Sequence, residues 1–222
     1  MAYIDLMSPL HKATTRDYLA RVNDPEYPKA RAAELAKQWG YDYWDGDRRI
    51  NYGGYKYIPG RWAPVAKMMI QHYELKAGSK VLDVGCGKGF QMFELTQVLP
   101  GLEVHGLDIS TYAIEHAHAD IKHLIRQGSA AKLPFSDQEF DLVFSINTLH
   151  NLPNRELDAA LREMERVGKH KYLCVESYRN ETEKANLLYW QVTCEQFNSP
   201  DDWAWWFDVT GFSGDFSFIY FE

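Results

Sequence analysis

The sequence contains no run of about 18 apolar residues, the length that a helix needs to cross a membrane. Its first residues lack the basic region and apolar stretch that mark a secretory signal. Cysteine is scarce as well: the three copies, at positions 86, 174 and 194, stand too far apart for a C-x-x-C motif or a disulfide framework. We therefore expect a cytoplasmic protein without a membrane partner.

An excess of basic residues, which nucleic-acid binders use to neutralise phosphates, is also missing. The formal net charge is −7 and the pI is about 5.6. The first 78 residues are mildly basic, with 12 Lys and Arg against 9 Asp and Glu. They include a patch that keeps one route to nucleic acid open, formed by Arg48, Arg49, Lys56 and Arg61. We expect a nucleic-acid partner to be unlikely on this balance of charge.

No spacing typical of metal ligands is present. The histidines at 116, 118 and 123 do not place two ligands on one face of a helix. Nothing near Cys86 indicates an activated thiolate. We expect no bound metal.

The first 60 residues predict a helical cap without strands. Ser8-Pro9 indicates a helix that runs to about residue 22, and Asp24-Pro25 begins a second that ends at Gly40. Residues 41–60 mix glycine and aromatic residues without a period, which is typical of an ordered loop. A helix over 61–73 then opens the second expected domain, residues 61–222.

From residue 79 the pattern alternates between strands and helices. Short apolar stretches predict strands at 81–84, 103–107, 124–127, 140–146 and 171–176. The segments between them predict helices at 90–99, 110–123 and 154–167. This order indicates an α/β fold, a Rossmann-like doubly wound sheet that is mostly parallel with helices on both faces.

The C-terminal segment, residues 180–222, is rich in aromatic side chains. Residues 199–202 look like the start of a helix, and 216–221 like a final strand. An exposed edge strand of this composition is a surface that a second copy could cover, so a homodimer is one expectation.

A glycine-rich turn carries the chemistry. Residues 81–90 read Val-Leu-Asp-Val-Gly-Cys-Gly-Lys-Gly-Phe, in which a strand ends in G-x-G-x-G and a helix begins. The dinucleotide fingerprint needs glycine or alanine at position 90, and the phosphate-binding P-loop has a different spacing, so neither fits. The next strand ends at Asp108, where a carboxylate can accept both hydroxyls of a ribose.

These motifs resemble those of the class I S-adenosylmethionine-dependent methyltransferases. Ala131-Lys132-Leu133-Pro134-Phe135 and the Phe-Asp-Leu-Val of residues 140–143 are similar to a further segment of that family. The resemblance covers about residues 79–177. The family usually ends its sheet with a helix and two strands, so either a strand lies within 180–200 or the sheet is one strand short.

The resemblance implies S-adenosylmethionine as cofactor, with S-adenosylhomocysteine as product. Asp83 would orient the glycine turn, Asp108 would bind the ribose, and Ile109 would lie against the adenine. The adenine amino group would meet Ser129 and Ala130, where many relatives have an acidic residue. The remaining implied contacts lie at the methionine end: Gly85, Cys86, Gly87, Gly89 and Asn147.

Candidate catalytic residues follow the later strands. His150 and Glu176 stand at strand ends, where ligands bind in doubly wound sheets, and either suits a general base. Glu176 could instead bind a cationic substrate. Packing under a helix is the structural alternative for His150, and a salt bridge to Arg179 that for Glu176. In the loop, Tyr57 is a third catalytic candidate, while Tyr52 and Arg61 are candidate substrate contacts. Its tyrosines could cover the sulfonium by cation–π contact, and Arg61 could pair with a carboxylate. A packed structural loop is the alternative for this segment.

We therefore expect a methyltransferase that acts by in-line displacement on an oxygen or nitrogen of a small polar molecule. Alternatives are a non-catalytic cofactor-binding subunit of a partner enzyme, or a protein or nucleic-acid methyltransferase.

Overall fold

The computed structural model describes residues 1–10, 16–53 and 55–222. Its centre is a six-stranded sheet in the order β3-β2-β1-β4-β5-β6, in which every neighbouring pair is parallel. The strands are β1 (Lys80–Val84), β2 (Glu103–Asp108), β3 (Ile125–Gln127), β4 (Phe140–Ile146), β5 (Gly168–Glu176) and β6 (Asp215–Ile219). The order reverses between β1 and β4, and sheets of this kind bind ligands outside the carboxyl ends at that point.

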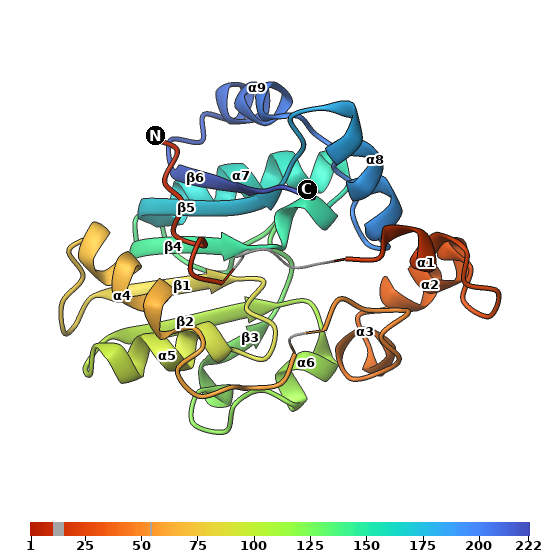
Figure 1. The fold of residues 1–222 in the computed structure, drawn as a ribbon. Helices are drawn as coiled ribbons and strands as arrows, with labels where there is room; N and C mark the ends of the chain where they lie inside the picture. The colour runs from red at the N-terminus through yellow and green to blue at the C-terminus, as the bar shows by residue number, and fades with distance from the viewer. Residues whose placement is uncertain (11–15, 54) are drawn as a thin grey trace.

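Helices cover both faces of the sheet (Figure 1). One face packs against α4 (Ala63–His72) and α5 (Phe90–Val98), the other against α7 (Asn154–Val167) and α9 (Pro200–Thr210). The alternation of side chains along each strand divides the core: Val81 and Tyr172 face α4 and α5, whereas Leu82 and Leu173 face α7 and α9. Among the helices of the described residues, none is long and apolar enough to cross a bilayer.

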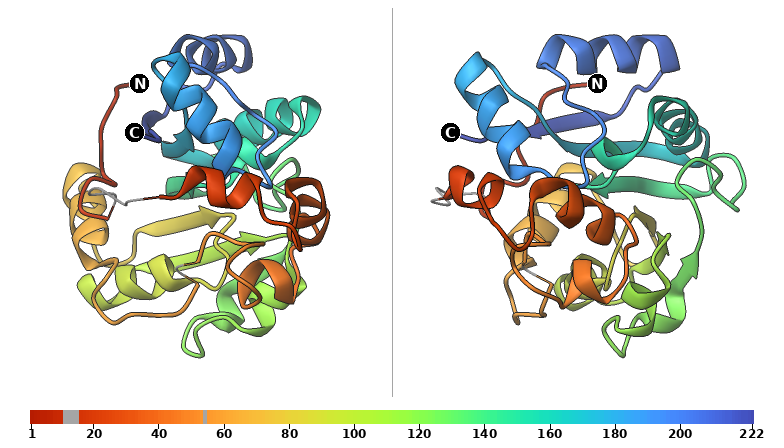
Figure 2. Two further views of the ribbon diagram at one scale, coloured as in Figure 1. Left: turned by 45° about the vertical axis from the view of Figure 1, so that its right-hand side comes forward. Right: turned by 90° about the vertical axis from the view of Figure 1, so that its right-hand side faces the viewer.

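A helical cap lies beyond the carboxyl ends of the strands (Figures 1 and 2). We use "cap" for residues 16–53 and 55–62, which include α1 (Tyr18–Val22), α2 (Lys29–Ala36) and α3 (Tyr41–Trp44). The three short helices of the cap do not form a core by themselves. Their apolar side chains pack around Tyr43, Ile50 and Val192. Val192 follows α8 (Glu181–Trp190), so the cap is joined to the second half of the chain.

The expected helix over residues 9–22 is wrong at its start. Residues 8–10 form a turn, residues 11–15 lie outside the described residues, and α1 begins only at Tyr18. The physical reason is a better cap: the Asp17 side chain accepts a hydrogen bond from the Ala20 N–H at 2.9 Å.

The expected helix over residues 110–123 is also too long. It begins as predicted, with the Ser110 hydroxyl accepting a bond from the Ala113 N–H, but α6 (Thr111–Glu115) ends after five residues. The His118 N–H donates to the carbonyl of Lys88 at 3.0 Å, which ties this segment to the glycine turn. A hydrogen bond to a distant segment of the chain thus takes the place of the next turn of the helix.

The C-terminal part of the sheet is one strand short of the family pattern. Residues 181–190 form α8, and the last strand, β6, runs parallel to β5. The Ile4 N–H donates to the Phe216 carbonyl, and the Phe216 N–H donates to the Ala2 carbonyl. The N-terminal residues thus cover part of this edge, and the expected homodimer stays a prediction.

Candidate functional site

A cleft of about 870 Å³ opens at the carboxyl ends of β1, β2, β4 and β5. Two parts of the chain line it: the turns that follow these strands, and residues of the cap. In the right-hand view of Figure 2 the cap (red to orange) lies in front of the sheet, below α8 (light blue). The site therefore has a floor from the sheet and a cover from the N-terminal region.

The glycine-rich turn after β1 forms the floor. Gly85, Cys86 and Gly87 line the cleft, whereas Gly89 lies behind them and caps α5. Gly87 has a φ of 54°, and a Cβ placed on it would come within 2.6 Å of the Trp44 ring in the cap. Only glycine lets the cap approach the turn this closely.

Asp108, at the end of β2, holds this turn. Its Oδ2 accepts a hydrogen bond from the Gly87 N–H at 2.7 Å, and its Oδ1 accepts one from the Ser110 N–H at 2.8 Å. Burial raises the pKa of Asp108, and these backbone donors oppose that effect. Each carboxylate oxygen keeps a second lone pair, so the side chain can still accept hydroxyl groups from a ligand.

Asp83, the fourth residue of β1, also lines the cleft and is only 5% exposed. Burial and the charge of Asp108 raise the pKa of Asp83 well above its ordinary value. No donor from the part of the chain that the structure describes contributes to that pKa. A positively charged ligand group would supply the missing donor and lower the pKa again.

The residues predicted to contact a base lie beyond Asp108. Ile109, Ser129 and Ala130 all line the cleft. Ile109 is 54% exposed, so its side chain offers an apolar surface to a flat ring. The Ser129 hydroxyl accepts a hydrogen bond from the Ala131 N–H at 3.2 Å and has capacity for another contact.

Four residues around the cleft have a buried polar atom without a hydrogen-bond partner in the described residues. These atoms are Gln91 Oε1, Asn147 Oδ1, His150 Nδ1 and Asn151 Oδ1. Asn147 also has a φ of 56°, which is uncommon for a residue other than glycine. Because buried polar atoms are nearly always bonded, their concentration here indicates a site that a polar ligand or solvent completes.

Glu176 and His150 lie together in the lining of the cleft. The Nε2 atom of His150 is 3.5 Å from Oε2 of Glu176, and both side chains are buried. Burial lowers the pKa of His150 to about 3 and raises the pKa of Glu176 to about 8. At neutral pH His150 is neutral and most Glu176 is protonated, so the contact is not an ion pair.

Gln191 and Tyr52 hold the Glu176 carboxyl group in place. The Gln191 Nε2 donates to Glu176 Oε2, and the Tyr52 hydroxyl donates to Gln191 Oε1 at 2.6 Å. The same hydroxyl accepts the N–H groups of Val192 and Thr193 at 2.7 and 3.0 Å. This network links the cap to the end of β5. Glu176 therefore does not form the salt bridge to Arg179 that was the structural alternative.

The structure places Tyr57 away from the cleft, which corrects its assignment as a catalytic candidate. Its hydroxyl donates to Glu94 of α5 at 2.8 Å, and its ring packs against Phe93. The Gly60 N–H donates to the same carboxylate at 2.7 Å, so this part of the loop is held on α5. The other two loop candidates, Tyr52 and Arg61, do line the cleft.

Polar contacts fasten the cap to the floor. The Trp44 Nε1 donates to the Ser110 hydroxyl at 2.9 Å. Lys88 in the glycine turn lies 2.7 Å from a carboxylate oxygen of Asp45, which also accepts a bond from Tyr112. The charge of Lys88 is thereby neutralised by the cap.

Sequence reasoning missed several residues of the cleft. Asn151 follows β4 in the segment that already gave Asn147 and His150, so its position after a strand was a usable signal. Gln191 offers no such signal, because its partner Tyr52 is 139 positions away in the chain. Trp44 was visible only as one aromatic residue among many.

Comparison with known proteins places most of the chain in one family. A family model described as a methyltransferase domain matches residues 75–211, which include the glycine turn, Asp108, His150 and Glu176 but not the cap. Demethylmenaquinone methyltransferase of Staphylococcus carnosus is 37% identical over 108 residues, covering 46% of this chain and 44% of that protein. The 27-O-demethylrifamycin SV methyltransferase of Amycolatopsis mediterranei is 31% identical over 88 residues, covering 36% and 32%. This chain thus spans less than half the length of either relative.

A solved structure has the same fold. The YcgJ protein of Bacillus subtilis superposes with a TM-score of 0.55 at 24% identity, over 65% of this chain and 66% of the other. At this identity the likeness concerns the fold alone.

Proposed function

Because this chain belongs to the class I S-adenosylmethionine-dependent methyltransferase family, we propose that it transfers a methyl group from S-adenosylmethionine to an oxygen or nitrogen of a small polar molecule. The observation that carries the proposal is the division of the cleft into two halves. One half holds the glycine turn with Asp83 and Asp108, and the other holds the buried Glu176 and His150 beneath the cap.

The first half fits the cofactor. The Asp108 carboxylate has lone pairs that its backbone contacts do not use, and these accept hydrogen bonds from the ribose hydroxyls. The Asp83 carboxylate accepts a hydrogen bond from the amino group. The backbone of Gly85, Cys86 and Gly87 passes along the methionine part, a close approach that side chains would block. Bound there, S-adenosylmethionine supplies a methyl carbon activated by a positively charged sulfonium.

Further contacts complete this half. Ile109 lies against the adenine, Ser129 and Ala130 meet its edge, and Asn147 lies at the methionine end, where its buried Oδ1 awaits a donor. The unpartnered polar atoms around the cleft support this assignment, because a bound ligand removes their cost.

The second half handles the proton. An oxygen or nitrogen acceptor loses a proton as it is methylated, and in our proposal the ionised form of Glu176, the minor form at neutral pH, takes it. A base works best when its pKa is near the working pH, and burial brings the pKa of Glu176 to about 8. Neutral His150, 3.5 Å away, orients the carboxyl group.

A small acceptor suits the enclosure. Glu176 and His150 are both less than 10% exposed and line the cleft. Its volume of about 870 Å³ lies within the range of about 300–1,000 Å³ that is usual for small-molecule sites. The two curated relatives described above are likewise named for small acceptors, demethylmenaquinone and demethylrifamycin.

A labelling experiment tests the proposal. The full chain is incubated with methyl-labelled S-adenosylmethionine and with separate small-molecule, protein and nucleic-acid fractions of a cell extract. We expect label in the small-molecule fraction, lost with Asp108→Ala and retained with Asp120→Ala, whose side chain is 71% exposed. Label confined to protein or nucleic acid, or no transfer to any fraction, would contradict the proposal.

A further inference from the structure

Three arginines of the cap line the cleft without a carboxylate partner in the described residues. They are Arg16, Arg48 and Arg61. The residues that the structure leaves out, 11–15 and 54, contain no aspartate or glutamate that could pair with them. By contrast, Arg49 lies within 4 Å of the carboxylates of Asp24, Glu26 and Asp47. Positive charge is thus neutralised on the outside of the cap and left available on the inside.

Arg16 is positioned by aromatic rings rather than by an acid. Its guanidinium lies 4.7 Å from the ring centre of Phe221 and 5.6 Å from that of Trp190. Stacking of this kind fixes the plane of a guanidinium and leaves its N–H groups free at the edge. Its charge also acts on Glu176, lowering a pKa that burial raises, so Arg16 and the candidate base belong to the same part of the cleft.

Arg48 is held in a space that a glycine provides. A Cβ on Gly53 would come within 1.7 Å of Arg48 Nη1, and Gly53 has a φ of 72°. The same Nη1 lies 3.4 Å from Asn51 Oδ1, a weak neutral contact that leaves most of the donors unused. The absence of a side chain at Gly53 therefore leaves the space that the Arg48 guanidinium occupies.

The cofactor cannot account for all three charges. S-adenosylmethionine has one carboxylate, which needs one of these arginines at most. Lys88 is already paired with Asp45, so it offers no alternative cation for that role. At least two guanidinium groups remain for the second ligand, and uncompensated cations in a cleft favour an anion.

We propose that the methyl acceptor is an anion, carrying a carboxylate or a phosphate group that Arg16 and Arg48 bind in the half of the cleft that contains Glu176. This inference rests on the proposed function and names the chemical class of its acceptor. A guanidinium matches either anion through two parallel N–H···O bonds, which orients the ligand as well as holding it. Arg61 is left for the carboxylate of the cofactor.

Simple anions test the assignment without knowledge of the acceptor. The full chain, saturated with S-adenosylhomocysteine, is titrated calorimetrically with inorganic phosphate or acetate against sodium chloride of equal ionic strength. We expect at least one of the two to bind the wild type, and at least about tenfold weaker binding in Arg16→Gln and Arg48→Gln. Gly53→Ala, which displaces the Arg48 guanidinium without removing its charge, is expected to weaken binding in the same way.

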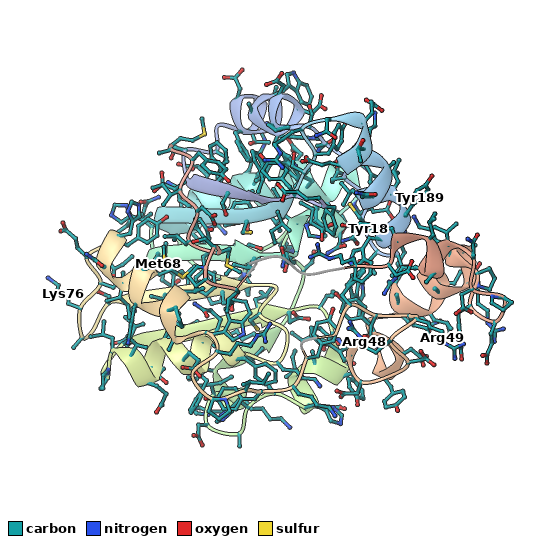
Figure 3. All side chains as sticks on the ribbon, in the orientation of Figure 1. Tyr18, Arg48, Arg49, Met68, Lys76 and Tyr189 are labelled. Atoms are coloured by element: carbon teal, nitrogen blue, oxygen red, sulfur yellow. The ribbon has the colours of Figure 1, made fainter. Side chains whose placement is uncertain are left out.

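Arg49→Gln is the matched control, because this neighbour has the same charge but pairs outside the cleft; Figure 3 shows it farther from the sheet than Arg48. It is expected to bind the anions as the wild type does. Binding of phosphate alone assigns a phosphate ester, and binding of acetate alone a carboxylic acid. No binding of either anion, or equal binding in all variants, overturns the proposal.

The same titrations separate this proposal from the proposed function. The affinity for S-adenosylhomocysteine is expected to stay within about twofold of the wild type in Arg16→Gln and Arg48→Gln. A loss of that affinity would assign the arginine to the cofactor and overturn its role toward the acceptor. Failure of the wild type to bind S-adenosylhomocysteine would contradict the proposed function itself.

Discussion

Nε2 of His150 lies 3.5 Å from Oε2 of Glu176, in a place where neither side chain is stable in its charged form. Glu176 ends β5 and His150 lies in the turn that follows β4, and the parallel pairing of these neighbouring strands brings the two residues together. A neutral imidazole beside a protonated carboxyl group is a pair that gives up one proton as the pH rises toward 8.

Replacement of Glu176 by glutamine is expected to change how stability depends on pH. Burial raises the pKa of Glu176 from 4.5 to about 8, so between these values the unfolded chain has lost a proton that the folded chain keeps. The wild type therefore loses stability as the pH rises through this interval, and Glu176→Gln escapes the loss. Urea unfolding at pH 6.5 and 8.5 is expected to show a relative gain for the variant, on the order of 1 kcal/mol or more.

His150 sets the lowest pH at which that comparison can be made. Its pKa is lowered from 6.5 to about 3, so it contributes stability that grows as the pH rises toward 6.5 and is constant above. Parallel dependence on pH in the wild type and in Glu176→Gln would show that this carboxyl group is not buried as described.

Tyr52→Phe is expected to destabilise the fold, because one hydroxyl serves three partners. It donates to Gln191 and accepts the N–H groups of Val192 and Thr193. Its removal leaves these groups unpaired, at a cost of about 1–3 kcal/mol in the free energy of unfolding. Tyr189→Phe is the control, because Tyr189 lies at the surface with its side chain exposed (Figure 3). Equal stability of the two variants in urea would contradict the network.

Gly87→Ala is expected to push the cap away from the floor of the cleft. The added Cβ lies 2.6 Å from the Trp44 ring, and overpacking of this kind costs about 1–3 kcal/mol. Gly78→Ala is matched in backbone conformation, with a φ of 85°, but nothing lies within 4 Å of its added Cβ. The difference in unfolding free energy between the two variants isolates the contact with Trp44, and no difference would show that the contact is not made.

The sequence alone predicted the bounds of those elements whose apolar pattern matches the burial of their side chains in the fold. The strand at 140–146 and the helix at 154–167 have the predicted bounds, because one is apolar on both faces and the other has a regular apolar stripe. The helix at 110–123 is shorter than predicted because the bond from His118 to Lys88 depends on where the glycine turn lies in space. No local pattern contains that information.

The same distinction applies to the site. The glycine turn and Asp108 could be found because their chemistry is encoded in short, ordered motifs. The network around Glu176 could not, because Gln191 meets Glu176, and Tyr52 meets Gln191, only after α8 and the cap have folded. The arginines of the basic patch have two different environments in the fold. Arg49 is paired with carboxylates at the surface, whereas Arg48 and Arg61 line the cleft.

Calorimetric titration of S-adenosylhomocysteine into the wild type and Asp108→Ala tests most directly whether this cleft is a cofactor site. We expect micromolar binding by the wild type and a loss of at least about tenfold in the variant, since the carboxylate that meets the ribose is gone. A urea unfolding curve of the variant verifies that it remains folded without the bonds to Gly87 and Ser110. Equal affinity in a folded Asp108→Ala, or no binding by the wild type, would contradict a cofactor site built on this residue.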